Sequence, residues 1–506
     1  MQRSIAEGHE SAPDAGRSTA RLIAVVVGLL LACAAFAVYW ISNPHHYNQY
    51  AHFVWQADAF LHGRSWFAYP IQNGVNTVTG DAFPGFPDNY YYQDVYPLKD
   101  AAGNDLGQVL LPFPPLPAIV LMPFVAVFGL FTDQEAIAIG LGALGVLTTW
   151  WMLGGLRHRL SVRILVTVIF ATGTTWWWAA AAGTTWYLAH LVALNLAMLA
   201  VGVTLRHDPR ASGETSREED NAAAEAHDAA GAPAAFLRRL WASAWPLDRS
   251  QVLAGLLLGL SATARLPLVF AAPWFVFVGG GGSRLRRTLS TGVGASLPVA
   301  ALLLYTFVST GSFLHPGYDY QYRLEAYGYP TLGYHTDWSV EDIRYIPHNL
   351  GIMLGSLPIV APDVKPNTLG FGDPIYLCVN PGDHRGLFDV NCPLVIPTDV
   401  GTSVLLSAPA LLLALLAFRR PRLARLKVGA SAAVVIIALF NLAHFSQGWV
   451  QWGYRFSLDF MPFLLPLVAL GAARADGRPR RIAFVLVALG AAVNLWGVTW
   501  GQILGW

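Results

Sequence analysis

The chain has 506 residues, a formal net charge of +1, 54% hydrophobic residues and only 12% charged residues. An average water-soluble domain has about a quarter of its residues charged, so this composition excludes an ordinary soluble protein. The near-neutral charge comes without a basic stripe or a stacking platform, and we therefore expect no nucleic-acid partner.

Apolar residues gather in runs of about 20, the length that crosses the hydrocarbon core of a bilayer. Lipid permits only helices or closed barrels at that depth, and long unbroken runs select helices. We expect an all-α polytopic membrane protein with about 11–13 transmembrane helices. The expected spans are 21–41, 135–155, 162–181, 184–204, 251–264, 266–280, 288–310, 400–418, 428–445, 457–473 and 482–500.

The first apolar run could be a signal peptide, because small residues at Ala34, Ala35 and Ala37 could mimic a cleavage site. The run continues past them to Ile41, which favours an uncleaved anchor. The amphipathic stretch that follows, from Tyr47 to Gly63, has apolar residues at helical spacing and is expected to lie on the outer membrane surface.

Lys and Arg cluster at 157–163, 284–287, 419–427 and 474–481, and such clusters mark cytoplasmic flanks. The N-terminus is then cytoplasmic, and the protein is expected in a bacterial inner or plasma membrane. The expected parts are a cytoplasmic tail (1–20), an N-terminal membrane module (21–204) with an extracytoplasmic loop (42–112), a cytoplasmic disordered linker (205–250), a membrane module (251–310), a second extracytoplasmic loop (311–398) and C-terminal membrane helices (399–506).

Segment 113–131 is apolar but holds four prolines and directly follows Pro112, and this proline density disfavours a regular helix. As a full span it would also place the basic cluster at 157–163 outside. A re-entrant segment, or one lying along the outer leaflet, is the alternative.

Acids and aromatics are mixed in the first large loop, where Asp88 and Asp94 lie near Tyr91 and Tyr92. Aromatic faces cover the apolar surfaces of sugars, and a carboxylate can take a proton from an attacking hydroxyl. For any single acid, an ordinary solvated side chain is the alternative.

Two arginines stand where the positive-inside rule does not explain them. Arg265 interrupts two apolar half-segments at an expected outer turn, and it could reach a lipid phosphate or simply snorkel to the interface. Arg455 lies at the outer entry of a span, where it could bind a phosphate or pair with Asp459 four residues later.

The stretch Gly173–Trp186 is rich in Trp and is typical of an interfacial aromatic belt. His190 follows it, either as a packed polar residue or as a substrate-binding residue. Cys378 and Cys392 share the second large loop, where they could form a disulfide in an oxidising compartment or remain free thiols.

Several of these landmarks, in this order and spacing, resemble the polyprenyl-phosphate-sugar-dependent glycosyltransferases of the GT-C superfamily, in particular protein mannosyltransferases and the lipid A aminoarabinose transferase. The similar features are the stretch Tyr47–Gly63, the loop acid, the Phe113–Leu116 box, the Ala264–Pro267 turn, and Gly453–Phe456 with Pro462. They extend over most of the membrane-embedded chain.

The resemblance implies an inverting transfer of a sugar from a polyprenyl-phosphate donor to a hydroxyl of an extracytoplasmic glycan, lipid or protein. Tyr47–Tyr50 lacks the Asp-Glu pair of the mannosyltransferases, so the catalytic base is matched by distance from the Pro-Pro box to Asp94, with Asp88 and Asp58 as fallbacks. Arg265 and Arg455 would bind the lipid phosphate, and Tyr318 of the second loop would contact substrate. No cofactor is implied with certainty, although acidic loop residues could bind a divalent metal.

Two other functions are compatible with the sequence. A transporter should carry ionisable residues near the bilayer midplane and often has inverted repeats, whereas here the acids concentrate in loops. A non-catalytic lipid-binding protein would need the basic residues but no acid in a cleft.

Overall fold

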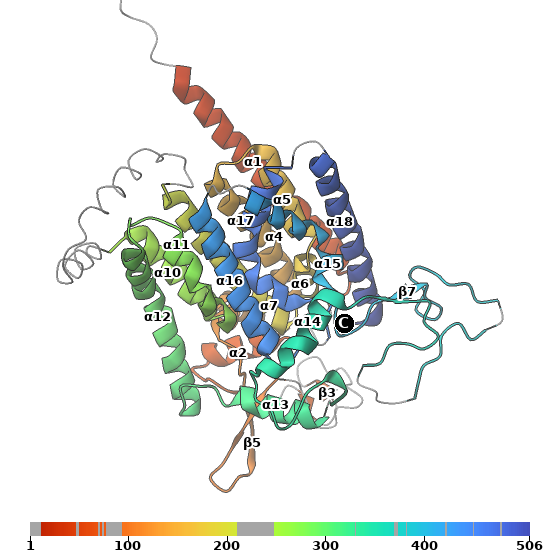
Figure 1. The fold of residues 1–506 in the computed structure, drawn as a ribbon. Coiled ribbons are helices and arrows are strands. Elements are labelled where there is room, and N and C mark those ends of the chain that lie inside the picture. The colour runs from red at the N-terminus through yellow and green to blue at the C-terminus, as the bar shows by residue number, and fades with distance from the viewer. Residues whose placement is uncertain are drawn as a thin grey trace, which may run out of the picture.

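The computed structural model is a helical bundle that carries two polar loop regions at one end (Figure 1). It describes residues 12–46, 50–68, 71–72, 75–76, 94–209, 247–328, 330–368, 373–380, 382–419, 423–448, 450–475 and 478–506. Three candidate site residues, Asp88, Tyr91 and Tyr92, lie outside these ranges, as do most of the expected linker and half of the expected tail.

Seven helical segments of the described chain are long and apolar enough to cross a membrane. They belong to α1 (Ala12–Ser42), α4 (Gln134–Leu153) with η3 (Gly154–Leu156), α7 (Thr185–His207), α12 (Arg284–Thr310), α16 (Ala424–Ala443), η8 (Arg455–Phe460) with α17 (Met461–Ala472), and α18 (Arg478–Leu504). An eighth span is counted if α5 (Leu160–Thr172) and α6 (Trp176–Ala182), which meet at a 50° bend, cross together. The expectation of a helical membrane protein is confirmed.

Three other expected spans are too short to cross alone. They form α10 (Arg249–Ala262), η4 (Leu266–Ala271) with α11 (Ala272–Phe277), and α15 (Val404–Ser407) with η7 (Pro409–Arg419). The 14 residues of α10 extend about 21 Å, against a hydrocarbon core of about 30 Å. The hairpin formed by α10 and α11, which turns at Arg265, is therefore shorter than the hydrocarbon core and does not fill one end of the bundle.

The described residues of all four basic clusters lie at the opposite end of the bundle, called here the basic end. Arg474 is close to His158 and to Lys427. The clusters at 157–163, 419–427 and 474–481 therefore lie at the same end. The fourth begins α12, just after Gly279, whose N–H donates to Asp208 beyond the end of α7. The end with the two large loops is called the loop end.

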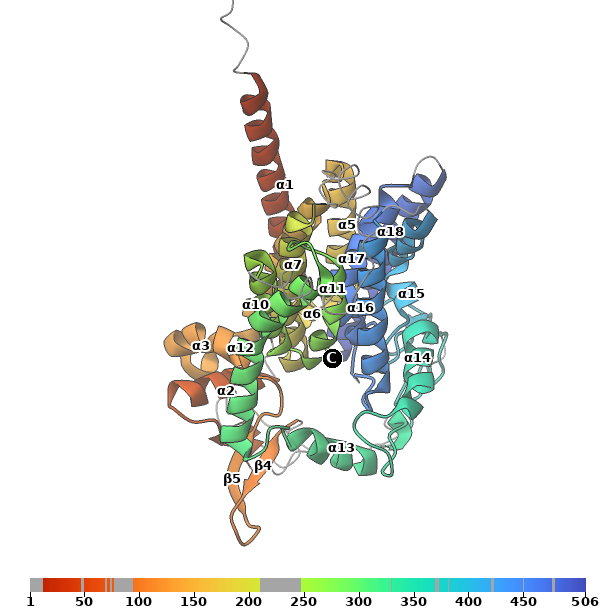
Figure 2. The same cartoon turned by 60° about the vertical axis from the view of Figure 1, so that its left-hand side comes forward.

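The ambiguous segment 113–131 does not cross the bundle. It forms α3 (Leu116–Phe128) and η2 (Gly129–Phe131), which lie beside α2 (His52–Leu61) at the loop end (Figure 2). Asn43 after α1 donates to Glu135 of α4 at 2.5 Å, and His46 lies 2.9 Å from Asp133. The chain therefore leaves α1 and enters α4 at the same end of the bundle. Segment 113–131, which lies between these helices in the sequence, stays at the loop end.

The expected surface position of the amphipathic helix is wrong. Seven of the ten residues of α2 are buried, because α3 packs against one side and Tyr305 of α12 reaches the other. The Tyr305 hydroxyl accepts a hydrogen bond from Gln56 at 3.1 Å, and its ring packs edge-on against Phe60. The side-chain N–H of Gln56 thus binds inside the protein rather than at a water-exposed surface.

The expected interfacial Trp belt is also wrong, since Trp176, Trp177 and Trp178 are buried in the bundle. The chain bends at Gly173 and sends α6 inward. Trp176 donates to the carbonyl of Gly142 at 3.0 Å, and a Cβ at Gly145 would lie 2.1 Å from its ring. Glycine at 145 therefore permits this ring to pack against α4.

The remaining elements belong to the two loop regions. In the first, β1 (Phe67–Ala68), β5 (Asp105–Leu110) and β4 (Tyr96–Lys99) form an antiparallel sheet in the order β1-β5-β4, and β2 (Ile71–Gln72) pairs with β3 (Val75–Asn76). In the second lie α13 (Gly317–Gly328), η5 (Pro330–Leu332), η6 (Ile343–Tyr345), α14 (Ile346–Gly355) and the antiparallel pair β6 (Ile359–Val360) and β7 (Val395–Ile396).

Cys378 and Cys392 form a disulfide within the second loop region, which confirms that alternative over two free thiols. The backbone N–H of Cys378 also donates to Asn391 at 2.9 Å, and that of Gly386 to Cys392 at 2.9 Å. The described residues between 359 and 396 are called the disulfide loop.

Replacing both cysteines with serine should loosen the disulfide loop. Closing a loop of about 15 residues contributes about 3 kcal/mol, and the two cysteines are 14 residues apart. We expect protease cleavage between 378 and 392 to accelerate by about a hundredfold, since 1.4 kcal/mol is tenfold. Cys33→Ser, at the exposed free cysteine of α1, is the control and should leave the rate unchanged. Equal cleavage in the double variant and wild type would contradict the prediction.

Candidate functional site

A cavity of about 600 Å³ lies at the loop end of the bundle. Its walls come from the segment around Phe113, from η4, α12, α16 and η8, and from α13, which lies across this end (Figure 2). Asp94, Arg265 and Arg455 all line it. Cavities of about 300–1,000 Å³ are typical of small-molecule sites.

Asp94 enters the cavity just before β4. Its φ of 68° is in the left-handed region, which Asp adopts more readily than most residues. The carboxylate accepts hydrogen bonds from the indole of Trp186 and, at 2.7 Å, from the amide of Gln321. Burial raises the pKa of Asp94 to about 6, although the Trp186 hydrogen bond and the charge of Arg455 act in the opposite direction. At neutral pH the group is a carboxylate that gains a proton easily.

Arg265 is held by a bidentate ion pair with Asp459. Its Nη2 and Nε lie 2.8 and 3.3 Å from the two carboxylate oxygens. Asp459 is fully buried and also accepts a hydrogen bond from Asn441 at 3.0 Å, while His190 Nδ1 lies 3.0 Å from it. Three groups thus orient Asp459, and Asp459 orients the guanidinium at the cavity wall.

The alternative of an Arg455–Asp459 helix pair is wrong. These residues lie in η8, a 3₁₀ helix, where residues three apart share a face and residues four apart do not. The two side chains therefore point in different directions, and Asp459 meets a partner 194 positions away instead.

Arg455 is surrounded by aromatic rings. Its guanidinium carbon lies 5.8, 5.7 and 5.3 Å from the ring centres of Trp186, Tyr187 and Phe456. The residue is only 7% exposed, and its Nε has no hydrogen-bond partner among the described residues. In that part of the chain it forms no ion pair at contact distance. The Tyr187 hydroxyl and the carboxyl groups of Asp94 and Glu325 are close enough to interact with its charge. A buried cation of this kind favours an anionic ligand.

The wall opposite these groups is α13. Gln321 binds Asp94, and Glu325, one turn later on the same face, also lines the cavity. Burial and the negative charge of Asp94 raise the pKa of Glu325 well above its usual value. Tyr318 lies one turn before Gln321 and packs edge-on against Phe113. Sequence reasoning missed Gln321 and Glu325, although their helical spacing from Tyr318 could have drawn attention to them.

Other predicted site residues are placed elsewhere. Asp58 of α2 lies 3.6 Å from the solvent-exposed His62 and does not line the cavity. His190 was a candidate for substrate contact, but it is fully buried behind Asp459 and does not line the cavity either. Asp88, Tyr91 and Tyr92 fall outside the described residues.

Protein-family models, curated proteins and solved structures contain no match for this chain.

The cavity therefore offers two guanidinium groups and an easily protonated carboxylate between aromatic walls. Cations of this kind bind phosphate through charge-assisted hydrogen bonds, and the carboxylate is suited to accept a proton. Within the described ranges, no three His, Cys, Asp or Glu side chains gather closely enough to hold a metal ion.

Proposed function

We propose that this protein is a membrane glycosyltransferase of the GT-C type, which transfers a sugar from a polyprenyl-phosphate donor to an acceptor hydroxyl. The observation that carries the proposal is Arg455, a buried guanidinium that lines the cavity and forms no ion pair at contact distance among the described residues. The phosphate of the donor would supply the missing anion.

The position of the basic clusters supports an extracytoplasmic active site. Because Lys and Arg mark the cytoplasmic side, the basic end would face the cytoplasm and the cavity would open on the opposite side. The acceptor would then be a glycan, lipid or protein of the cell envelope, and the lipid donor would enter from the bilayer.

Trp186 links the two halves of the proposed reaction centre. Its indole N–H binds Asp94, and its ring lies beside the Arg455 guanidinium. A sugar phosphate held by Arg455 would thus have its anomeric carbon close to the carboxylate. Effective catalysis needs this kind of fixed approach between reacting groups.

In the proposed reaction Asp94 takes the proton of the acceptor hydroxyl, and the hydroxyl oxygen forms a bond to the anomeric carbon. The bond from that carbon to the phosphate oxygen breaks, and its electron pair leaves with the polyprenyl phosphate. Arg455 and Arg265 stabilise the charge on the departing phosphate. Attack from the face opposite the phosphate inverts the anomeric centre.

The test uses purified protein in nanodiscs with a panel of radiolabelled polyprenyl-phosphate sugars and a cell-envelope extract as acceptor. Wild type should consume at least one donor. Arg455→Gln should lower kcat/KM for that donor by roughly 30- to 150-fold, because a hydrogen bond to a charged group contributes about 2–3 kcal/mol.

Arg323→Gln is the matched control, since Arg323 is 72% exposed on α13 and is not part of the cavity wall. It should transfer sugar at the wild-type rate. If wild type consumes no donor, or if Arg455→Gln is as active as Arg323→Gln, the proposal fails.

A further inference from the structure

The disulfide loop exposes apolar side chains that no contact within the described chain accounts for. Val360 is 71% exposed and Val379 67%, and Ile375, Tyr376 and Leu387 are more than half exposed as well. Large apolar patches on a surface mark places where a protein contacts another apolar phase. The disulfide holds this segment together covalently. The exposed apolar side chains therefore belong to a folded part of the chain.

The depth of the loop is set by α18. Phe388 of the loop packs against Trp500, with ring centres 6.3 Å apart. Trp500 lies one turn before the end of the candidate span Arg480–Leu504, which runs from the basic end to the loop end. Aromatic residues at the end of a span lie at the boundary between hydrocarbon and headgroups, and the disulfide loop therefore begins at that boundary.

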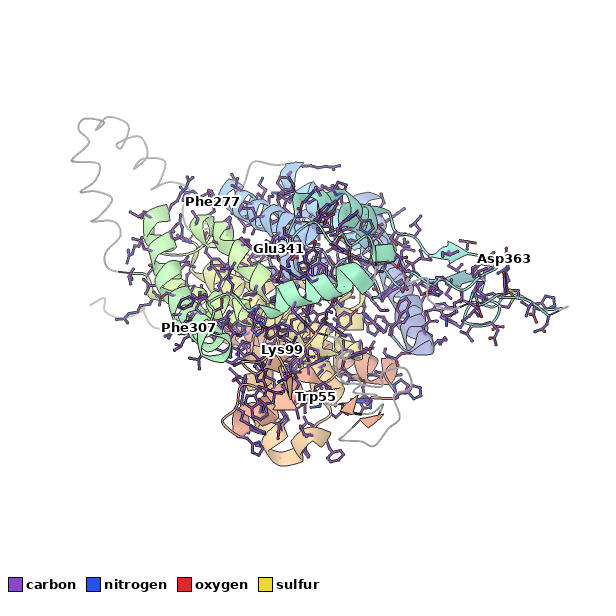
Figure 3. All side chains as sticks on the ribbon, turned by 90° about the horizontal axis from the view of Figure 1, so that it is seen from below. Trp55, Lys99, Phe277, Phe307, Glu341 and Asp363 are labelled. Carbon is purple, nitrogen blue, oxygen red and sulfur yellow. A yellow bond between two sulfur atoms is a disulfide. The ribbon has the colours of Figure 1, made fainter. Side chains whose placement is uncertain are left out.

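The loop also points sideways. Seen from the loop end, Asp363 of the disulfide loop lies far outside the ring of helices, whereas Lys99 of the β4–β5 hairpin lies beneath the bundle (Figure 3). The neighbouring surface of α18 is itself apolar and exposed, at Leu495 and Ile503. Because the disulfide loop extends sideways from the apolar surface of α18, at the depth of the lipid headgroups, it lies over the lipid that surrounds the protein.

The charges of the loop exclude attraction to anionic headgroups as the main force. Arg385 is paired with Asp363 at 2.9 Å, and the other charged groups of the described loop include Lys365 together with Asp373, Asp383 and Asp389. An excess of acids is unfavourable near anionic lipid. Burial of apolar surface is the force that remains.

We propose that the disulfide loop inserts its exposed apolar side chains into the bilayer leaflet at the loop end. Insertion would anchor the C-terminal part of the second loop region. The N-terminal part of the same region, α13, forms one wall of the cavity. This inference concerns the lipid surface and is independent of the proposed sugar transfer.

The test places an environment-sensitive fluorophore on single cysteines of the full chain in phosphatidylcholine nanodiscs. Val360→Cys and Leu387→Cys report on the loop, and Lys99→Cys is the matched control because it is exposed at the same end but projects away from the bilayer. All three are made in a Cys33→Ser background with the native disulfide intact. Nitroxide-labelled lipid and soluble iodide are the two quenchers.

We expect nitroxide lipid to quench the fluorophore at 360 and 387 several times more strongly than at 99, with iodide showing the reverse order. The result should be unchanged in high salt. Strong iodide quenching at both loop positions would mean that the loop is in water and would overturn the inference. Protection from both quenchers would indicate a protein partner and would overturn it equally.

Discussion

Asp94→Asn should lower the rate of sugar transfer by about a thousandfold, since positioned proton transfer contributes about 10²–10⁴-fold. Asparagine has nearly the same shape and its oxygen can still accept the Trp186 hydrogen bond, so the fold should persist. What it lacks is the ability to accept a proton at neutral pH. Transfer is measured with the donor that wild type consumes.

Asp58→Asn is the control for this substitution, because Asp58 belongs to the same loop region and lies outside the cavity. It should retain wild-type activity. Equal transfer by Asp94→Asn and wild type would remove Asp94 from the mechanism, even if the protein proved to be a glycosyltransferase.

The pH profile provides a second readout of the same residue. Because burial raises the pKa of Asp94 to about 6, the carboxylate becomes protonated as the pH falls through that value and can no longer act as a base. The wild-type rate should be level above pH 7 and fall tenfold per unit well below pH 6. The residual rate of Asp94→Asn should lack this acid limb.

The sequence predicted a helical membrane protein because hydropathy and basic clusters are local signals, although three of the eleven expected spans form helices too short to cross alone. Each span is a run of apolar residues, and each cluster lies next to a span, so neither depends on distant contacts. The Cys378–Cys392 disulfide was one of two alternatives that the sequence left open, because both cysteines lie in one loop but no local signal decides between a disulfide and free thiols. Segment 113–131 could not be settled, because its path depends on the contact of Asn43 with Glu135.

The wrong predictions concern residues whose contacts in the folded protein are far away in the sequence. The polar face of α2 predicted a water-exposed side, yet Gln56 meets Tyr305, which is 249 positions away. Trp176 was assigned to an interface because nothing in its neighbourhood shows that Gly145 admits its ring.

The candidate site includes residues that the sequence pointed to and one contact that it did not. Arg265 and Arg455 were singled out by an unusual local setting and Asp94 by its distance from the Pro-Pro box, and all three line one cavity. The pairing of Asp459 with Arg455 was one alternative that the sequence offered, because the two residues are four positions apart, whereas the chain folds Arg265 onto Asp459.

Asp459→Asn should be the most destabilising of the substitutions considered. The carboxylate is fully buried between Arg265, His190 and Asn441. Removing its charge leaves the guanidinium without an anion in a site of low polarity, and breaking a buried ion pair costs about 3–5 kcal/mol. Thermal unfolding of the purified protein in nanodiscs should show a clear loss against Asp363→Asn, whose carboxylate is 88% exposed and contributes at most about 1 kcal/mol.

A second variant separates the cost of an unpaired charge from the value of the pair. Arg265→Leu combined with Asp459→Asn removes both charges, and replacing a buried pair by apolar groups is often neutral for stability. The double variant should therefore unfold at a higher temperature than Asp459→Asn alone. Its sugar transfer should stay reduced, because the cavity has lost one phosphate-binding guanidinium. Additive destabilisation by the two changes would contradict this prediction, because it would show that the two side chains are not energetically coupled.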